Sequence, residues 1–140
     1  MDFELVRKTL QGQGFMKLIG ARVDRVEKGL CELSVDFREE LTQQHGFFHG
    51  GLTAFLIDNA TTAAAGTVVR EDRVVLTAEY KLNFLSPAVG ERLVCRASVI
   101  KPGSMLTVVE GKVFAVKDGQ EKLVAVALAS IANVPAERVG

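Results

Sequence analysis

The 140-residue sequence has no tryptophan, only three prolines, two cysteines and two histidines, and no excess of either charge. A net charge of zero argues against a nucleic-acid surface, which needs clustered basic residues. No apolar run approaches the ~20 residues that cross a membrane, and the N-terminus lacks the long apolar segment of a signal peptide. We therefore expect a cytoplasmic protein with no nucleic-acid or membrane partner. The length predicts a single domain over residues 1–140.

The few cysteines and histidines also bear on metal binding. Cys31 and Cys95 each alternate with apolar residues, which is typical of the buried face of a strand. A catalytic thiol would need a nearby histidine and a polar niche, and neither cysteine has one in the sequence. We therefore interpret both as small buried hydrophobic residues, and we expect no metal and no cofactor.

The hydrophobic pattern changes period along the chain. The first dozen residues predict a short helix that ends near Gly12 or Gly14, and residues 50–67 predict a long apolar helix. Strands are predicted at 18–27, 30–38, 74–85, 92–100, 105–116 and 123–131, and the tail from 135 to 140 is expected to fray. One long helix followed by consecutive strands predicts the α+β class, because a parallel sheet needs a crossover between each pair of strands.

The long predicted helix carries one unusual residue. Between Gly50 and Val69 the only ionisable side chain is Asp58. A helix that is hydrophobic nearly all round is buried, and a buried carboxylate without a partner costs several kcal/mol. The helix contains no Lys or Arg that could pair with this carboxylate. Asp58 is therefore interpreted as a residue retained for chemistry.

Three segments, taken together, resemble the hotdog-fold acyl-CoA thioesterases, and most of all the subgroup with the phenylacetic-acid-pathway thioesterases and thioesterase superfamily member 2. They read QQHGFFHGG at 43–51 with Asp58 at the family spacing, LTAEYKLNFLSPA at 76–88, and KPG at 101–103. The resemblance covers roughly residues 20–131. It implies a long central helix wrapped by a curved antiparallel sheet of about six strands, with a short N-terminal helix. It also implies hydrolysis of an aryl- or medium-chain acyl-CoA to a free acid and CoA.

The resemblance also implies roles for four residues in catalysis. Asp58 would activate water or attack the thioester carbonyl directly, and the residues leave both routes open. Gly50 would donate its backbone N–H to the oxyanion, because N–H groups at a helix start are unpaired. Gln43 stands where many relatives have Asn, and it would hold the thioester carbonyl or the water across a subunit interface. Thr77 would orient water beside Asp58, although Thr is also simply a good strand residue.

Five further residues are candidates near the helix start. The His49 ring is expected to bond the backbone and fix the turn that positions Gly50, and a role as general base is the sharper alternative. His45 and Gly51 border the predicted substrate site. Phe47 and Phe48 line the acyl pocket or pack in the core or an interface.

The expected assembly is a homodimer at least, with a tetramer formed as a dimer of dimers. The resemblance places each site between Asp58 of one chain and the Gln43 loop of the other, with the seam along strand 77–85. It leaves open which basic residues hold the CoA phosphates.

Two other functions compete with a thioesterase. A hotdog hydratase or dehydratase commonly has an Asp-x-Asn-Pro-x-His pattern, which this sequence lacks. A non-catalytic acyl-CoA-binding module would have no reason to keep Asp58 in its helix.

Overall fold

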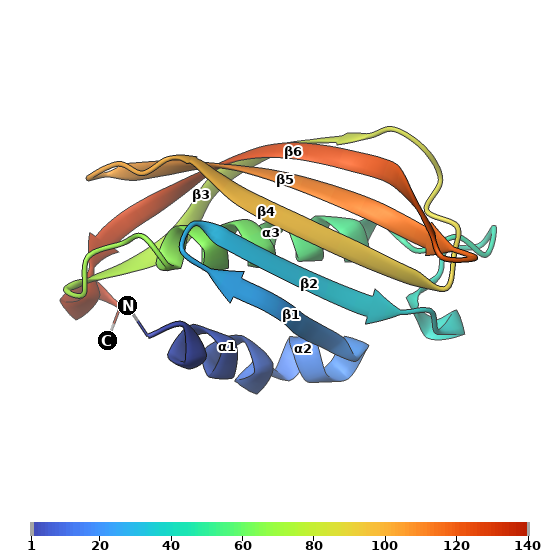
Figure 1. Cartoon of the computed structure of the whole chain (residues 1–140), viewed down its shortest axis with the longest axis horizontal. Coiled ribbons are helices and arrows are strands. Elements are labelled where there is room, and N and C mark those ends of the chain that lie inside the picture. The colour runs from blue at the N-terminus through green and yellow to red at the C-terminus, as the bar shows by residue number, and fades with distance from the viewer. Residues whose placement is uncertain (1, 140) are drawn as a thin grey trace.

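The computed structural model describes residues 2–139, in which one long helix lies inside a curved antiparallel sheet (Figure 1). The sheet has six strands in the order β1-β2-β4-β5-β6-β3, so β1 and β3 form its edges. This arrangement confirms the predicted α+β hotdog fold. The elements in chain order are α1 (Phe3–Gly12), α2 (Gly14–Ile19), β1 (Ala21–Glu27), β2 (Leu30–Asp36), η1 (Glu39–Leu41), α3 (Gly50–Gly66), β3 (Arg73–Phe84), β4 (Arg92–Lys101), β5 (Leu106–Lys117), β6 (Gln120–Pro135) and η2 (Ala136–Arg138).

The central helix α3 packs against the concave face of the sheet, mainly against β2, β4 and β5. Its alanine-rich second half favours a helix and lets the backbone approach the sheet closely. On β5, a Cβ added at Gly111 would lie 2.8 Å from the Cδ1 atom of Ile57. The missing side chain at Gly111 therefore leaves room for the Ile57 side chain of α3.

Two predicted boundaries are wrong at the ends of the chain. The strand predicted at 18–27 begins only at Ala21, because Gly14–Ile19 forms a second short helix. Gly20 ends this helix in a left-handed conformation with φ of 71°, which glycine adopts without strain. The predicted fraying tail is also ordered over its described residues, since β6 continues to Pro135 and the Ala136 N–H donates to the Asp72 carbonyl.

Both cysteines are fully buried, as predicted. Burial raises the pKa of the Cys31 thiol to about 12, and burial likewise raises the pKa of Cys95. The Cys95 thiol donates to the Leu56 carbonyl of α3 at 3.5 Å. The two thiols are therefore neutral packing groups between the sheet and the helix.

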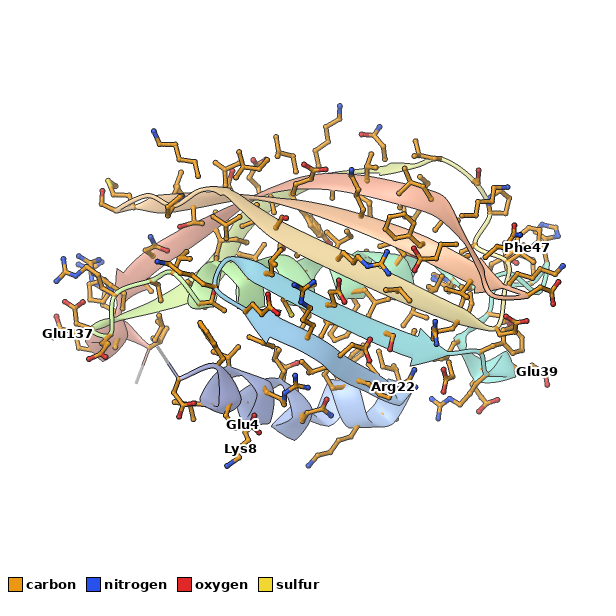
Figure 2. All side chains as sticks on the ribbon, in the orientation of Figure 1. Glu4, Lys8, Arg22, Glu39, Phe47 and Glu137 are labelled. Atoms are coloured by element: carbon orange, nitrogen blue, oxygen red, sulfur yellow. The ribbon has the colours of Figure 1, made fainter. Side chains whose placement is uncertain are left out.

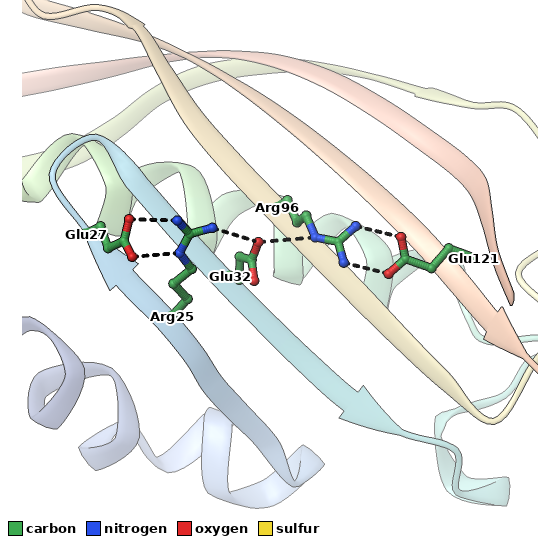
Figure 3. Close-up of polar contacts among 5 residues, drawn as sticks. All are labelled: Arg25, Glu27, Glu32, Arg96 and Glu121. Carbon is green, nitrogen blue, oxygen red and sulfur yellow. Dashed lines mark hydrogen bonds and ion pairs between the residues drawn. The ribbon is translucent and has the colours of Figure 1, made fainter. Parts of the chain in front are cut away.

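The outer face of the sheet carries a row of alternating charges (Figure 3). Arg25 pairs with Glu27 and Glu32, and Arg96 pairs with Glu32 and, through two nitrogens, with Glu121. The hydrogen bonds from Arg96 hold the pKa of Glu121 below its ordinary value. The row ties the β1–β2 hairpin to β4 and β6, which lie much later in the sequence.

The N-terminal helix α1 presents a polar face to solvent. Asp2 caps it by accepting hydrogen bonds from the backbone N–H groups of Glu4 and Leu5. Glu4 and Lys8 point away from the sheet (Figure 2), while Leu10 is buried. No helix within residues 2–139 is long and apolar enough to cross a membrane.

Candidate active site

The loop before α3 is held by backbone hydrogen bonds at both of its ends. The Phe48 N–H donates to the Ala88 carbonyl at 3.0 Å, and the His49 N–H donates to the Leu41 carbonyl at 2.9 Å. Figure 2 shows Phe47 and Glu39 at one end of the molecule, opposite Glu137. The loop therefore places the start of α3 at a fixed position at that end.

His49 is the N-cap residue of α3. Its Nδ1 atom accepts a hydrogen bond of 2.8 Å from the Gly51 N–H, so the ring bonds the backbone as the sequence predicts. Within residues 2–139 the neighbouring Gly50 N–H has no hydrogen-bond acceptor. The start of the helix thus presents one free N–H at its positive end, which is a suitable donor for an anionic oxygen.

Gly50 lines a pocket of about 430 Å³ together with Gln43, Phe47 and Phe84. A Cβ added at Gly50 would lie 3.4 Å from the Phe84 ring, so glycine keeps the backbone open beside this ring. Phe48 also borders the pocket, but it is 4% exposed and belongs to the hydrophobic core.

Three other candidates near this pocket differ in exposure. The Gln43 side chain is half-buried and accepts a hydrogen bond from the His45 backbone N–H. His45 is exposed, and its ring centroid lies 6.2 Å from that of Phe47. Gly51 is exposed and donates its N–H to His49.

A second polar cluster lies further along α3. The Thr77 hydroxyl on β3 donates to Asp58 Oδ1 at 2.5 Å, and the Thr62 hydroxyl lies 2.8 Å from the Thr77 hydroxyl. Asp58 is half-buried rather than fully buried. Its carboxylate is therefore not left without a partner, because a neutral hydroxyl from the same chain binds it.

A β-bulge in β3 lies directly after Thr77. Thr77 pairs with Ile131 and Glu79 pairs with Ser130, so Ala78 is an extra residue in the strand. Beyond the bulge the even-numbered side chains, including that of Phe84, face α3 in place of the odd-numbered ones. The bulge thus allows Thr77 and Phe84 to reach the same helix from one strand.

The candidates fall into two groups that one chain does not bring together. Gly50 and Asp58 are eight residues apart on α3, which corresponds to about 12 Å along the helix axis. The pocket beside Gly50 has no contribution from Asp58. One group contains Gln43, Phe47 and Gly50, and the other contains Asp58 and Thr77.

Sequence reasoning missed Thr62. The Thr62 hydroxyl also lies 2.7 Å from the Asp58 carbonyl oxygen. Its position four residues after Asp58, on the same helix face, was the available signal.

The fold and the sequence both match known proteins. Residues 45–122 match the profile of the thioesterase superfamily. A putative esterase of Saccharolobus solfataricus is 34% identical over 125 residues, covering 88% of this chain and 79% of that protein. Human acyl-coenzyme A thioesterase 13 is 33% identical over 108 residues, covering 74% of each chain. The crystal structure of a thioesterase family protein from Silicibacter pomeroyi is 40% identical with a TM-score of 0.90, covering 94% of this chain and 96% of that chain. This chain therefore belongs to the thioesterase superfamily, a family of hydrolases.

Proposed function

We propose that this protein is an acyl-CoA thioesterase of the phenylacetic-acid-pathway and thioesterase superfamily member 2 type, which hydrolyses an aryl- or medium-chain acyl-CoA. The observation that carries the proposal is the hydrogen bond of 2.5 Å from Thr77 to Asp58, on an open junction between α3 and β3. Similarity to a relative named acyl-coenzyme A thioesterase 13 supports the CoA thioester as the substrate class.

Asp58 supplies the base or the nucleophile in this reaction. As a base, it takes a proton from water while the water oxygen bonds to the thioester carbon, and the C–S bond then breaks as the sulfur receives that proton. As a nucleophile, its own oxygen bonds to the carbon and expels the CoA thiolate, and water hydrolyses the resulting anhydride. In both routes the carbonyl oxygen becomes anionic and accepts a hydrogen bond from the Gly50 N–H.

A second copy of the chain would bring the two groups of residues together. β3 is an edge strand, and Phe84 at its end is 59% exposed. A two-fold axis at Lys81 would pair β3 with itself, and because Ala78 is the extra residue of the bulge, it would set Thr77 opposite Phe84 of the second copy. Since Phe84 borders Gly50, Asp58 of one chain would then lie beside Gly50 of the other. We propose this homodimer as the active unit, with a dimer of dimers as the complete assembly.

Free-thiol release from a panel of aryl- and fatty-acyl-CoAs tests the function. Asp58→Ala and Asp58→Asn are expected to lower turnover by about 100-fold or more, because the base or nucleophile is lost. Asp118→Asn is a matched control on the exposed turn between β5 and β6, where φ is 52° and Asn is well tolerated. Wild-type turnover in folded, oligomeric Asp58→Ala would refute the mechanism.

Mixing two inactive variants tests the shared site. Asp58→Ala and Gln43→Ala subunits, unfolded and refolded together, would form mixed dimers that each contain one intact site. With random pairing, activity is expected to return to about a quarter of the wild-type value. No recovery, despite mixed dimers being detected by native mass spectrometry, would place Asp58 and Gln43 in the same subunit's site.

A further inference from the structure

The two edges of the sheet differ in what their main-chain groups contact. β1 and β3 are the edge strands, and an edge strand carries N–H and C=O groups that another strand can bind. Within residues 2–139 no side chain forms a hydrogen bond with the main chain of β3. The helix α1, in contrast, lies along β1 (Figure 1).

Val23 of β1 has both of its main-chain groups bonded by side chains of α1. The Val23 N–H donates to Gln11 Oε1 at 2.7 Å, and Arg7 Nη1 donates to the Val23 carbonyl at 2.5 Å. Arg7 and Gln11 are four residues apart, so they lie on the same face of the helix. In an antiparallel sheet one residue gives both its N–H and its C=O to the same neighbouring strand. The two side chains therefore occupy the place that a further strand would take.

A β-bulge divides β1 into two short regular halves. Val23 pairs with Leu33 and Arg25 pairs with Glu32, so Asp24 is an extra residue in the strand. The second half carries the ion pair of Arg25 with Glu27, and charged side chains keep an edge strand from pairing. The first half, which ends at Val23, is the half that α1 covers.

The helix α1 is also held by contacts that do not involve the edge of β1. Leu10 is buried in the hydrophobic core. At the end of the helix, the Gln13 and Asn59 side-chain amides exchange hydrogen bonds of 3.3 Å and 3.0 Å, which join α1 to α3. Substitutions at the two residues that bind Val23 should therefore leave the helix in place.

We propose that α1 guards the β1 edge, and that without Arg7 and Gln11 a second copy of this chain pairs with β1 as an antiparallel strand. A second copy fits because the exposed groups are self-complementary. About a two-fold axis at Val23, each Val23 N–H would meet the Val23 carbonyl of the other copy. The same axis would bring Arg22 of one copy beside Asp24 of the other, and these residues have opposite charges.

Replacing both guarding side chains by methionine tests the inference. Arg7→Met and Gln11→Met in one variant remove the donor and the acceptor but keep long side chains that favour a helix. At low protein concentration the Val23 amide hydrogen should exchange about tenfold faster or more than in the wild type, because its acceptor is lost. As the concentration rises, the weight-average mass from analytical ultracentrifugation should exceed that of the wild type by about twofold or more.

Glu4→Met with Lys8→Met is the matched control. These residues have the same spacing on α1 and point away from the sheet (Figure 2), so the control adds two methionines without opening β1. It should keep the wild-type mass at every concentration. Equal growth in mass of the control would overturn the inference, because exposed methionine would then account for the association.

A single cysteine locates the new contact. Asp24→Cys places a thiol on an exposed part of β1, and both native thiols are buried. A short bis-maleimide should join this thiol to that of a second copy in the Arg7→Met, Gln11→Met background, and not in the otherwise wild-type chain. Larger species that do not cross-link would place the contact elsewhere and overturn the inference.

Two further outcomes decide the case. Wild-type mass at all concentrations, despite fast exchange at Val23, would show that the uncovered edge binds no second copy. Slow exchange at Val23 in the folded variant would show that α1 does not guard the edge. Gln11→Met alone frees the N–H and should also speed its exchange and raise the mass, so it gives the same test if the double variant does not fold. None of these measurements depends on thiol release, so the inference and the thioesterase function fail separately.

Discussion

The Thr77 hydroxyl lies 2.5 Å from Asp58 Oδ1, which is within the range of a hydrogen bond to a charged oxygen. It joins the edge strand β3 to the helix α3 at the one ionisable residue of that helix. Asp58 is therefore fixed in orientation by a neighbour that carries no charge of its own.

Replacing Thr77 by Val should lower kcat by about 10- to 100-fold, because the carboxylate loses the group that orients it. Thr77→Ser keeps the hydroxyl and should stay within about threefold of the wild-type kcat. Thiol-release kinetics measure both, and circular dichroism checks that each variant is folded. A Val variant with wild-type kcat would restrict Thr77 to a structural role.

His49 is expected to act through the backbone and not as a base. Its Nδ1 atom accepts from the Gly51 N–H. His49→Ala should lower both the melting temperature and kcat, since loss of an N-cap costs about 1 kcal/mol and frees the helix start. His49→Asn supplies another N-cap acceptor, and it should recover most of both quantities. If Asn restores stability but leaves kcat as low as in the Ala variant, then His49 does more than position the backbone.

Substituting Gly111 should destabilise the fold. A Cβ at this position would lie 2.8 Å from Ile57 Cδ1 and 3.3 Å from Thr61 Cγ2, and the larger Val side chain would force the Ile57 side chain or α3 to shift. Gly111→Val is expected to cost about 1–3 kcal/mol in the free energy of unfolding, measured by urea denaturation. Gly12→Val, at the last residue of α1, is the comparison variant, because a Cβ at Gly12 meets no atom within 4 Å. It should change the free energy of unfolding less than Gly111→Val does. A Gly111→Val variant as stable as the wild type would show that the added side chain fits between β5 and α3 without a cost in the free energy of unfolding.

The two cysteines should resist thiol reagents in the native protein. Burial raises the pKa of Cys31 to about 12, so almost no thiolate is present at pH 8. We expect Ellman's reagent to detect essentially no fast-reacting thiol before denaturation and both thiols after it. Rapid native labelling of Cys31→Ser would identify Cys95 as accessible, contrary to its complete burial.

The charged row on the outer face should make stability depend on acid pH. Arg96 lowers the pKa of Glu121 below the ordinary value of 4.5, so the unfolded chain takes up this proton first as the pH falls. The stabilisation is present above about pH 4.5 and is lost as the pH falls through the lower, folded-state pKa. Glu121→Gln should reduce stability at pH 7 by less than about 1 kcal/mol, since the pair is partly exposed, and should flatten the decline below pH 4.5. Melting temperatures from pH 3 to 7 test this, and an equal decline in both proteins would contradict it.

The sequence predicts the central helix and most strands well because their patterns are local. The alanine-rich run after Asp58 favours a helix, and strict alternation around Cys31 indicates a strand. The second helix at Gly14–Ile19 was missed because six residues are too few for a periodic signal. Its burial against the rest of the fold is a property of the tertiary structure.

The candidate site is predictable only in part, for a similar reason. Asp58 stands out because it is the only charge in an apolar helix, and Gly50 stands out at the helix start. Thr77 and Phe84 both face the helix only because of the bulge at Ala78, which the pairing of β3 with β6 reveals. The hydrogen bonds between the Gln13 and Asn59 side-chain amides join residues 46 positions apart, and neither local sequence indicates them.

The extra residue at Ala78 also limits how β3 can change in length during evolution. Removing Ala78 would restore strict alternation, and one half of the strand would then turn its helix-facing side chains outward. If the Thr77 side chain stayed against α3, the Phe84 side chain would face outward. If the Phe84 side chain stayed against α3, the Thr77 side chain would face outward. Deletion of Ala78 would therefore remove either the contact of Thr77 with Asp58 or the contact of Phe84 with Gly50, so the two contacts could no longer be made by one strand.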